Sequence, residues 1–503
     1  MTAGGGGPFR HGVASGDPLP DAVVLWTRVT VPEGDAVPVR WRVSRSSDGG
    51  APAVAEGHAT ASAEDDFTVK VDVGGLEPAT TYHYRFEVDG AASPVRVRPT
   101  GDAAPSGQTA AVRLGVVSCA NWAHGLFTAY RHLAEREVDL VVHLGDYVYE
   151  SDEAWTELGR SHNPAARLRT LADYRARHAQ YRTDPDLRRL HERHPLVAVW
   201  DDHDVAGNAW RDGAADHDPA SDGPWPRRRA AATRAFLEWL PVRTPDRSRP
   251  GRIYRSFALG DLVRLIMLDT RLEGRDRPAA DGERPVATVE SRSRSLLGDG
   301  QRRWLRDELR APAAWRVLGN QVMMAPLRLV TLPGPLRRFL PGTVAGGAGV
   351  NAGQWDGYPR ERRNLFEFVE RAGVSDIVVL TGDLHSSWAS ELTLDPTQPS
   401  RTVGVELVTP SITSRSFAEE VAPSLPGARA LLRRVVRRQN PHVRFFDLER
   451  HGYLVVDVDH DRVRAEWWHV DGVTDPAAGE TRAARWVVRR GDPLLVEESP
   501  ADR

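Results

Sequence analysis

Residues 112–146 contain the pattern that most limits how this chain can fold. Two apolar runs, 112–119 (VRLGVVSC) and 138–146 (VDLVVHLGD), flank the segment 125–136 (GLFTAYRHLAER), whose apolar residues form a helical stripe. A strand, a helix and a second strand, with both strands almost continuously apolar, are typical of a sheet that is covered on both faces. Five further apolar runs between residues 196 and 411 repeat the strand pattern. The sequence therefore predicts an α/β fold.

The first hundred residues follow a different pattern. Short β-type runs separated by turn residues predict a small all-β sandwich; they lie at 22–29, 37–44, 67–73 and 81–88. Tyr82 stands near the start of the last run and resembles the tyrosine corner of immunoglobulin-like and fibronectin type III domains. Residues 99–111 are rich in Pro, Gly, Ser and Ala. We therefore expect a β-sandwich domain at 1–98, a linker at 99–111 and a larger domain at 112–503.

Composition excludes several classes of function. A net charge of −3 is too small for general nucleic-acid binding. No apolar stretch is long enough to span a membrane. The single cysteine, Cys119, cannot form a disulfide within the chain.

Lys70 is the only lysine among 66 basic residues, so nearly all positive charge comes from arginine. This composition indicates coding bias first and phosphate recognition by arginine second.

Two later segments predict connections near a site. Residues 327–357 form a long Gly- and Pro-rich stretch, which is typical of a loop over a site. Residues 417–439 end in a basic helix, and residues 452–470 predict a terminal hairpin that turns at 459–461.

Polar clusters follow four of the predicted strands. Because α/β sites are usually built where strands end, these clusters are candidates for one shared site. They combine carboxylates, imidazoles, a phenol and a thiol, which is the donor set that a multi-metal centre needs, since cations neutralise groups that are costly to bury alone. The clusters are 118–121 (SCAN), 143–150 (HLGDYVYE), 199–208 (VWDDHDVAGN) and 380–388 (LTGDLHSSW).

The motifs GDxxY, xDHD and GDxH occur here in the order that resembles the calcineurin-like metallophosphoesterase superfamily. The opening SC, together with 11–29 (HGVASGDPLPDAVVLWTRV) and 440–453 (NPHVRFFDLERHGY), resembles the PhoD-type alkaline phosphatases and phospholipase-like diesterases. The resemblance covers roughly residues 9–470. It implies the four-layer α/β sandwich of the metallophosphoesterases, preceded by a fibronectin type III-like domain.

The same resemblance implies an iron site and a neighbouring divalent site. Asp146 would bridge the two metals, while Tyr149 and His385 would bind ferric iron. Asp383 would bind the neighbouring divalent ion. Cys119 would replace the first aspartate of the common superfamily pattern as an iron ligand.

One residue that differs from the usual superfamily motif indicates the identity of the second metal. Asp202 stands where an asparagine is usual, and an anionic oxygen ligand fits the one or two calcium ions that the resemblance implies, with zinc or manganese as substitutes. Asn208 would bind calcium or phosphate, and Asn121 would bind phosphate. His203 would stabilise the leaving group or the phosphate in the transition state.

Each of these residues also has a simpler interpretation. A lone strand-end cysteine such as Cys119 is usually a small core residue. Asp146 resembles a helix cap or turn residue, and Tyr149 a packed aromatic side chain. The DDHD run resembles a solvated turn. The ordered set of four clusters favours the site, with His143 assigned a structural role and with Arg271 and Gln321 as lesser candidates for substrate contact.

The predicted activity is hydrolysis of a small phosphate mono- or diester by a metal-activated hydroxide. One alternative is a phospholipase D-like diesterase that acts on lipid headgroups. A second is a non-catalytic surface-binding protein with a structural metal site. We expect a monomer. Residues 1–13 carry neither a signal-peptide core nor a twin arginine, so the chain as written is expected in the cytoplasm, although relatives of this type are often exported.

Overall fold

The structure is a computed structural model that describes residues 7–30, 34–48, 50–93, 96–97, 109–155, 158–243, 251–278, 294–327, 353–394, 401–421 and 428–498. Most of the predicted linker 99–111 and of the predicted loop 327–357 lies outside these residues.

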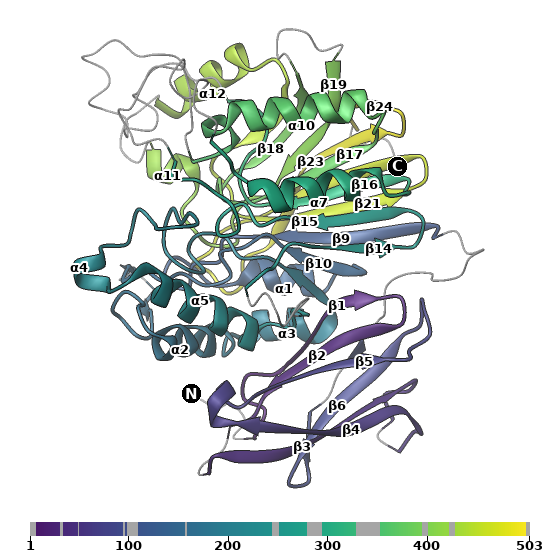
Figure 1. The fold of residues 1–503 in the computed structure, drawn as a ribbon, viewed down its shortest axis with the longest axis vertical. Helices are drawn as coiled ribbons and strands as arrows, with labels where there is room; N and C mark the ends of the chain where they lie inside the picture. The colour runs from purple at the N-terminus through teal and green to yellow at the C-terminus, as the bar shows by residue number, and fades with distance from the viewer. Residues whose placement is uncertain are drawn as a thin grey trace.

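A ten-stranded mixed sheet runs through the molecule (Figure 1). Its central strands β9, β10 and β13 are parallel neighbours, as the strand–helix–strand pattern predicts. In spatial order the strands are β24 (Asp492–Glu497), β23 (Glu480–Arg489), β22 (Arg462–Val470), β21 (Gly452–Asp459), β9 (Ala111–Val117), β10 (Leu140–His143), β13 (Leu196–Ala198), β1 (Val13–Leu19), β2 (Ala22–Arg28) and β5 (Thr68–Gly74).

A seven-stranded sheet packs face to face against the first. Along its strand β17, Val378 and Leu380 enter the core between the two sheets, whereas Ile377 and Val379 enter a core on the outer face. This alternation is why the run is apolar throughout. In spatial order the strands are β14 (Arg255–Leu259), β15 (Val263–Met267), β16 (Trp315–Asn320), β17 (Ile377–Thr381), β19 (Thr402–Val408), β18 (Ser387–Thr393) and β20 (Val443–Asp447).

Helices cover the outer faces of both sheets and complete a four-layer α/β arrangement. Helices α7 (Gly298–Arg310) and α10 (Pro359–Arg371) cover the seven-stranded sheet. The side of the ten-stranded sheet carries α1 (Thr128–Ala134), α2 (Leu171–Tyr181), α3 (Pro185–Arg193) and α5 (Trp225–Trp239). Shorter or later helices are α4 (Pro219–Asp222), α11 (Phe417–Val421) and α12 (Ala428–Gln439). In the part of the chain that the structure describes, no helix has the length and hydropathy to cross a membrane.

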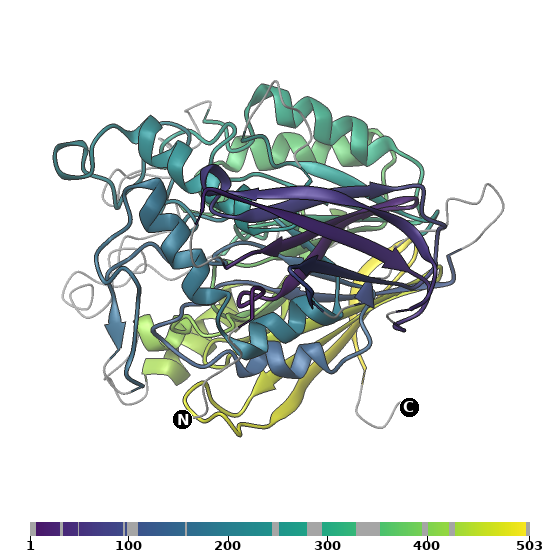
Figure 2. The same cartoon turned by 90° about the horizontal axis from the view of Figure 1, so that it is seen from below.

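The N-terminal region is all-β, as predicted. A smaller sheet packs on β1, β2 and β5 through an apolar core, and Figure 2 shows these strands in purple across the base of the molecule. The side chain of Tyr82 accepts a hydrogen bond from the backbone N–H of Glu77 at 2.9 Å, which is the contact expected of a tyrosine corner. The sheet consists of β4 (Ala53–Ser62), β3 (Ala36–Ser44), β6 (Tyr82–Val88), β7 (Ala91–Ala92) and β8 (Arg96–Val97).

One feature of this region is not visible in the sequence pattern. Strand β1 pairs in parallel with β13 through Gly16 and Leu196, so half of the N-terminal sandwich continues the ten-stranded sheet. Asp17 strengthens the junction, because its buried carboxylate receives two bonds from Arg255, at 2.6 and 2.8 Å. The boundary at residue 98 stays a prediction, but the two regions share a sheet.

The C-terminal prediction needs one correction. Strands β21 and β22 form the expected hairpin, but it is not terminal, because β23 and β24 extend it into a four-stranded meander. Strand β21 also pairs with β9, which places the meander beside the strand that leads to Cys119. The sequence pattern gave only the local hairpin, since apolar alternation does not show which strand a hairpin joins.

Candidate metal centre

The candidate ligands meet where parallel strands of both sheets end. Cys119 and Asp146 follow β9 and β10, and Asp202 follows β13, all in the ten-stranded sheet. Asp383 and His385 follow β17 of the seven-stranded sheet. The face-to-face packing of the sheets therefore brings together residues that are up to 266 positions apart along the chain.

The glycine in each GD motif allows this close approach. A Cβ atom on Gly145 would lie 2.3 Å from the backbone nitrogen of Asp201, and one on Gly382 would lie 2.8 Å from the Ser118 side chain. Any larger residue at either position would push the strand ends apart. Close packing therefore requires the glycine of each GD motif, and the candidate metal site requires the aspartate.

The backbone is strained at five of the candidate ligands. Cys119, Asp146, Asn208, Asp383 and His385 all have positive φ angles, between 50° and 61°. For residues with a side chain this conformation costs about 1–3 kcal/mol each, and it is kept where surrounding structure enforces it, typically at functional sites. An ordinary core cysteine or helix cap would not require it. The strain therefore supports the site interpretation over the simpler one.

Three groups of donors form a continuous cluster. Cys119, Asp146 and His385 each offer an atom within 4.8 Å of the others, as do Asp146, Asp202 and His203. A third group combines Asp202 and Asp383 with Asp201. Because Asp146 belongs to the first two groups and Asp202 to the last two, the donors fit adjacent cations that share carboxylate ligands.

The first group has a mixed donor set. The phenol of Tyr149 donates to Asp146 at 2.9 Å and lies 3.3 Å from Nε2 of His385. The other ring nitrogen of His385 lies 2.8 Å from the carbonyl oxygen of Arg415, which fixes the ring and leaves Nε2 facing the cluster. Thiol, phenol, imidazole and carboxylate around one point fit a transition metal.

Without a cation this group is electrostatically costly. Burial, with a contribution from Asp146, raises the pKa of the Cys119 thiol and of the Tyr149 phenol well above their usual values. Burial also raises the pKa of Asp146 to about 7, with the nearby Asp202 adding to the shift. A bound cation reverses this preference and favours the thiolate, the phenolate and the carboxylate.

The carboxylate side of the cluster contains only oxygen donors. Arg271, buried at the end of β15, forms ion pairs with Asp201, Asp202 and Asp383. This one guanidinium faces three carboxylates in direct ion pairs, and the charges of His203 and Arg275 also act on Asp202. One oxygen of Asp202, Oδ1, is buried and accepts no hydrogen bond from the described residues, although Nη2 of Arg271 lies within ion-pair distance at 3.2 Å. Both observations fit a hard cation such as calcium.

Comparison with known proteins agrees with this geometry. The family model described as "PhoD-like phosphatase" matches residues 114–467, and the model of the N-terminal domain of the same family matches residues 2–118. The chain belongs to the PhoD-like phosphatase family. Alkaline phosphatase D of Bacillus subtilis (strain 168) is 36% identical over 508 residues, covering 96% of this chain and 81% of that protein. The solved structure titled "Structure of PhoD" has a TM-score of 0.87 and 33% identity, covering 99% of this chain and 94% of the other.

This PhoD-like phosphatase is therefore an enzyme that hydrolyses phosphate esters, and its α/β fold with an all-β N-terminal region is that of the family. The alternative of a non-catalytic surface-binding protein is excluded by that membership.

His203 of this phosphatase is held by a residue that the motif analysis did not single out. The Nδ1 atom of His203 lies 2.8 Å from a carboxylate oxygen of Glu150, which is buried and also accepts a bond from the backbone of Gly207 at 2.7 Å. The ring stacks on Tyr149 at 4.4 Å. Burial disfavours the charged ring, but Glu150 and the nearby aspartates outweigh it and raise the pKa of His203 well above its usual value.

The two candidate asparagines differ in their exposure. The side chain of Asn121 is buried in its own loop, where Oδ1 accepts a bond from the backbone N–H of Ala123 and Nδ2 lies 3.4 Å from Glu153. Asn208 is exposed, and its backbone N–H bonds to Asp202. Phosphate or calcium contact by either side chain stays a prediction.

Gln321 is not placed for substrate contact. Its side chain accepts a bond from the backbone of Thr270 at 3.0 Å and donates to the carbonyl of Leu268 at 2.8 Å, so it supports the loop that carries Arg271. His143 bonds to Tyr130 at 2.9 Å inside the core, in agreement with its structural assignment.

Several residues of the centre are evident only in three dimensions. Asp201 and Glu150 stand inside the quoted clusters, but nothing in the sequence separates them from their acidic and aromatic neighbours. Asp204 supports the bridging loop, because its carboxylate accepts bonds from the backbones of Asp146 and Val148 at 2.8 and 3.1 Å. Ser414 has no sequence signal at all.

Ser414 joins two candidate iron ligands. Its hydroxyl lies 2.6 Å from the Tyr149 phenol oxygen and 2.9 Å from the carbonyl oxygen of Cys119. Replacing Ser414 with alanine is expected to weaken iron binding about 10- to 100-fold, the usual effect of losing a residue that orients a metal ligand. Competition with a chelator, followed by absorbance in the visible range, measures this. Unchanged iron affinity and an unchanged spectrum would contradict the role of Ser414.

Proposed function

We propose that this chain hydrolyses small phosphate esters with water activated at an iron site and an adjacent calcium site. The observation that carries the proposal is the shared cluster, in which Asp146 belongs to both a thiol- and imidazole-containing group and an acidic group. Such sharing is what a bridged pair of cations requires, and a purely structural site needs no such open arrangement.

The donors divide between the two kinds of ion. Cys119, Tyr149 and His385 supply the soft and phenolic ligands that suit ferric iron. Asp202 and Asp383 supply oxygen ligands that suit calcium, with the exposed Asn208 as a further oxygen donor. Zinc or manganese would fit the same carboxylates. When bound, the cations lower the pKa of a coordinated water and offset charge on the phosphoryl oxygens.

The protein's own groups handle the proton and the geometry. Glu150 holds Nδ1 of His203, so Nε2 is the atom available to protonate the departing oxygen of the ester. The ion pairs of Arg271 keep Asp201, Asp202 and Asp383 in a fixed arrangement. The choice between mono- and diesters, including phospholipid headgroups, depends on loops around the mouth, and most of 327–357 lies outside the described residues.

Metal analysis combined with paired substrates tests the proposal. Purified enzyme is expected to contain iron and calcium, to hydrolyse matched phosphomonoesters and phosphodiesters at different rates, and to lose activity with a chelator. Activity that survives complete removal of metal would contradict it. The ratio of the two rates assigns the ester class.

Cys119 tests the iron assignment directly. The wild-type enzyme is expected to be coloured by charge transfer from thiolate and phenolate to ferric iron. Replacing Cys119 with alanine should remove iron while the fold survives, because only the Sγ atom is lost from a buried position and the Cβ atom remains. Iron content and circular dichroism measure the two effects. A colourless, iron-free wild type with full activity would contradict the assignment.

A further inference from the structure

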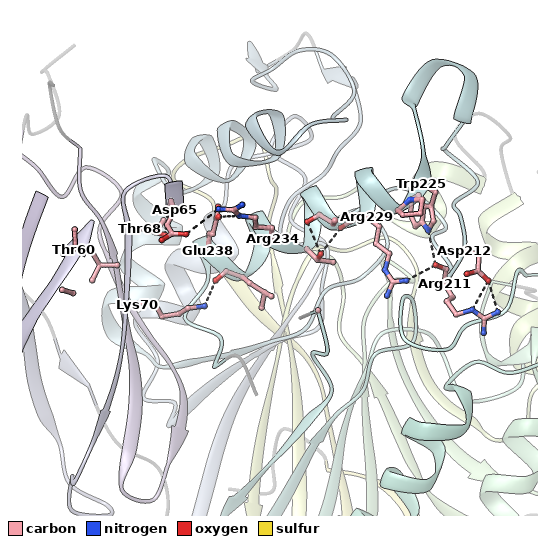
Figure 3. Close-up of a pocket in the computed structure, with 17 residues that line it drawn as sticks. Thr60, Asp65, Thr68, Lys70, Arg211, Asp212, Trp225, Arg229, Arg234 and Glu238 are labelled. Carbon is pink, nitrogen blue, oxygen red and sulfur yellow. Dashed lines mark hydrogen bonds and ion pairs between the residues drawn. The ribbon is translucent and has the colours of Figure 1, made fainter. Parts of the chain in front are cut away.

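A cavity lies away from the metal cluster, between the N-terminal strands and helix α5 (Figure 3). Its volume is about 1050 Å³, which is in the range of small-molecule sites. One wall comes from β4 and β5 and the segment between them, and the other from the length of α5 together with the loop at Arg211. We call this cavity the α5 groove. Clefts between structural units are frequent ligand sites.

Lys70, the only lysine of the chain, lines the α5 groove. Its ammonium group bonds to two backbone carbonyl oxygens, those of Leu237 at 2.5 Å and Val242 at 3.0 Å. Within the described residues no carboxylate lies within ion-pair distance of it. Burial lowers the pKa of Lys70 to about 8, because the positive charge is only partly compensated. A nearby anion would restore that compensation.

Arg229 is the second cation of the groove, and its charge acts on the buried carboxyl group of Asp269 without a direct ion pair. It makes one hydrogen bond, to the carbonyl oxygen of Arg211 at 3.1 Å, and among the described residues it has no ion pair. A guanidinium has five N–H donors, so most of them remain for a ligand in the groove. Arg211, beside it, is already paired with Asp212 at 2.9 Å.

The groove between these two cations is neutral and partly apolar. Arg234 is paired with Glu238 at 2.7 Å and with Asp65 at 3.7 Å, and Glu238 also pairs with Arg175 at 2.7 Å, so two cations and two carboxylates cancel along the middle. Small apolar side chains, including Val69 and Ala230, line the same stretch. Because Lys70 bonds to the carbonyl of residue 237, eight residues beyond Arg229 on one helix, the two positions on α5 at which the cations are held lie roughly 12 Å apart along the helix axis.

We propose that the α5 groove binds an elongated ligand that carries two anionic groups, carboxylates or phosphates, joined by a mainly apolar spacer. One anionic group pairs with Arg229 and the other with Lys70. The spacer lies against the neutral stretch of α5. This site is separate from the metal cluster and does not depend on the phosphatase chemistry.

The single lysine makes the test direct. Wild-type enzyme is treated with an acetylating ester, and acetylation of Lys70 is followed by mass spectrometry with and without decanedioate, a dicarboxylate long enough to span the distance between the two positions on α5. Decanedioate is expected to slow acetylation of Lys70 several-fold, whereas butanedioate, which is too short to reach both cations, leaves the rate unchanged. The diphosphonate of the same length shows whether the groove prefers phosphate over carboxylate.

Matched arginine variants provide the control. Arg229→Gln is expected to weaken decanedioate binding about tenfold in calorimetry and to abolish protection of Lys70. Arg227→Gln removes an exposed arginine of the same helix that does not line the groove, and it is expected to keep full protection. An unchanged acetylation rate with decanedioate, equal protection by butanedioate, or equal losses in the two variants would each overturn the proposal.

Discussion

Replacing Asp146 with asparagine is expected to lower kcat by about three orders of magnitude, on the scale of losing a group that stabilises charge in the transition state. Asp146 is shared by the two donor groups, so the loss of one negative charge weakens both candidate metal sites at once. Metal content, measured beside kcat, should fall together with the activity.

The fold of this variant is expected to survive. Burial raises the pKa of Asp146 to about 7, which means that the charged form is costly in the metal-free protein, and a neutral amide of the same shape avoids that cost. The metal-free variant should therefore unfold at a temperature no lower than that of metal-free wild type. Asp139→Asn, just before β10 at the end of the strand away from the site, is the matched control and should keep metal and activity. Near-normal turnover in Asp146→Asn would remove its bridging role.

Replacing His203 with asparagine is expected to lower kcat for an alkyl phosphate about 10²- to 10⁴-fold, the usual contribution of a positioned general acid. Asparagine can still donate to Glu150, as Nδ1 of the histidine does at 2.8 Å, but it has no atom in the place of Nε2. The loss should be much smaller for a nitrophenyl ester, because a nitrophenolate leaves without being protonated.

The dependence on the leaving group separates catalysis from metal binding. His203 follows Asp202 directly, so a variant that only disturbs the metal ligand would slow both substrates equally. Metal content is measured for the same preparation. Glu150→Gln is expected to lower kcat less than His203→Asn does, and again more for the alkyl phosphate than for the nitrophenyl ester. It leaves Nε2 of His203 in place but weakens the hydrogen bond that orients the ring. Equal losses on both esters would contradict the role of His203 in protonation.

Local pattern was sufficient to predict the strand-end clusters, and the family resemblance then assigned the candidate ligands within them. Cys119, Asp146, Asp202 and Asp383 each stand just after a buried strand, and the structure brings all four to one place. The spacing of apolar side chains and the position of the polar residues that follow them are local properties of the chain, so they can be identified from neighbouring residues. The order of the motifs then supplied the family, which the family models confirm.

Other partners in the centre could not be predicted in this way. Ser414 contacts a residue 295 positions earlier, and Arg271 bonds to Asp383, 112 positions later. Such pairs depend on how two sheets stack, and the sequence has no periodicity that records it. The local hydrogen bond of Asn121 Oδ1 to the backbone N–H of Ala123 is likewise evident only in the structure.

By itself the sequence determined the α/β class, the all-β N-terminal region, the strand-end clusters and the family. The tertiary structure alone decided that the N-terminal strands join the main sheet and that Asp146 and Asp202 are shared between donor groups. It also decided that Glu150 holds His203 and that Lys70 and Arg229 line one groove. The physical reason is the range of the interactions. Hydrophobic periodicity fixes what each segment becomes, whereas close packing of distant segments decides which polar groups meet and which charges remain uncompensated.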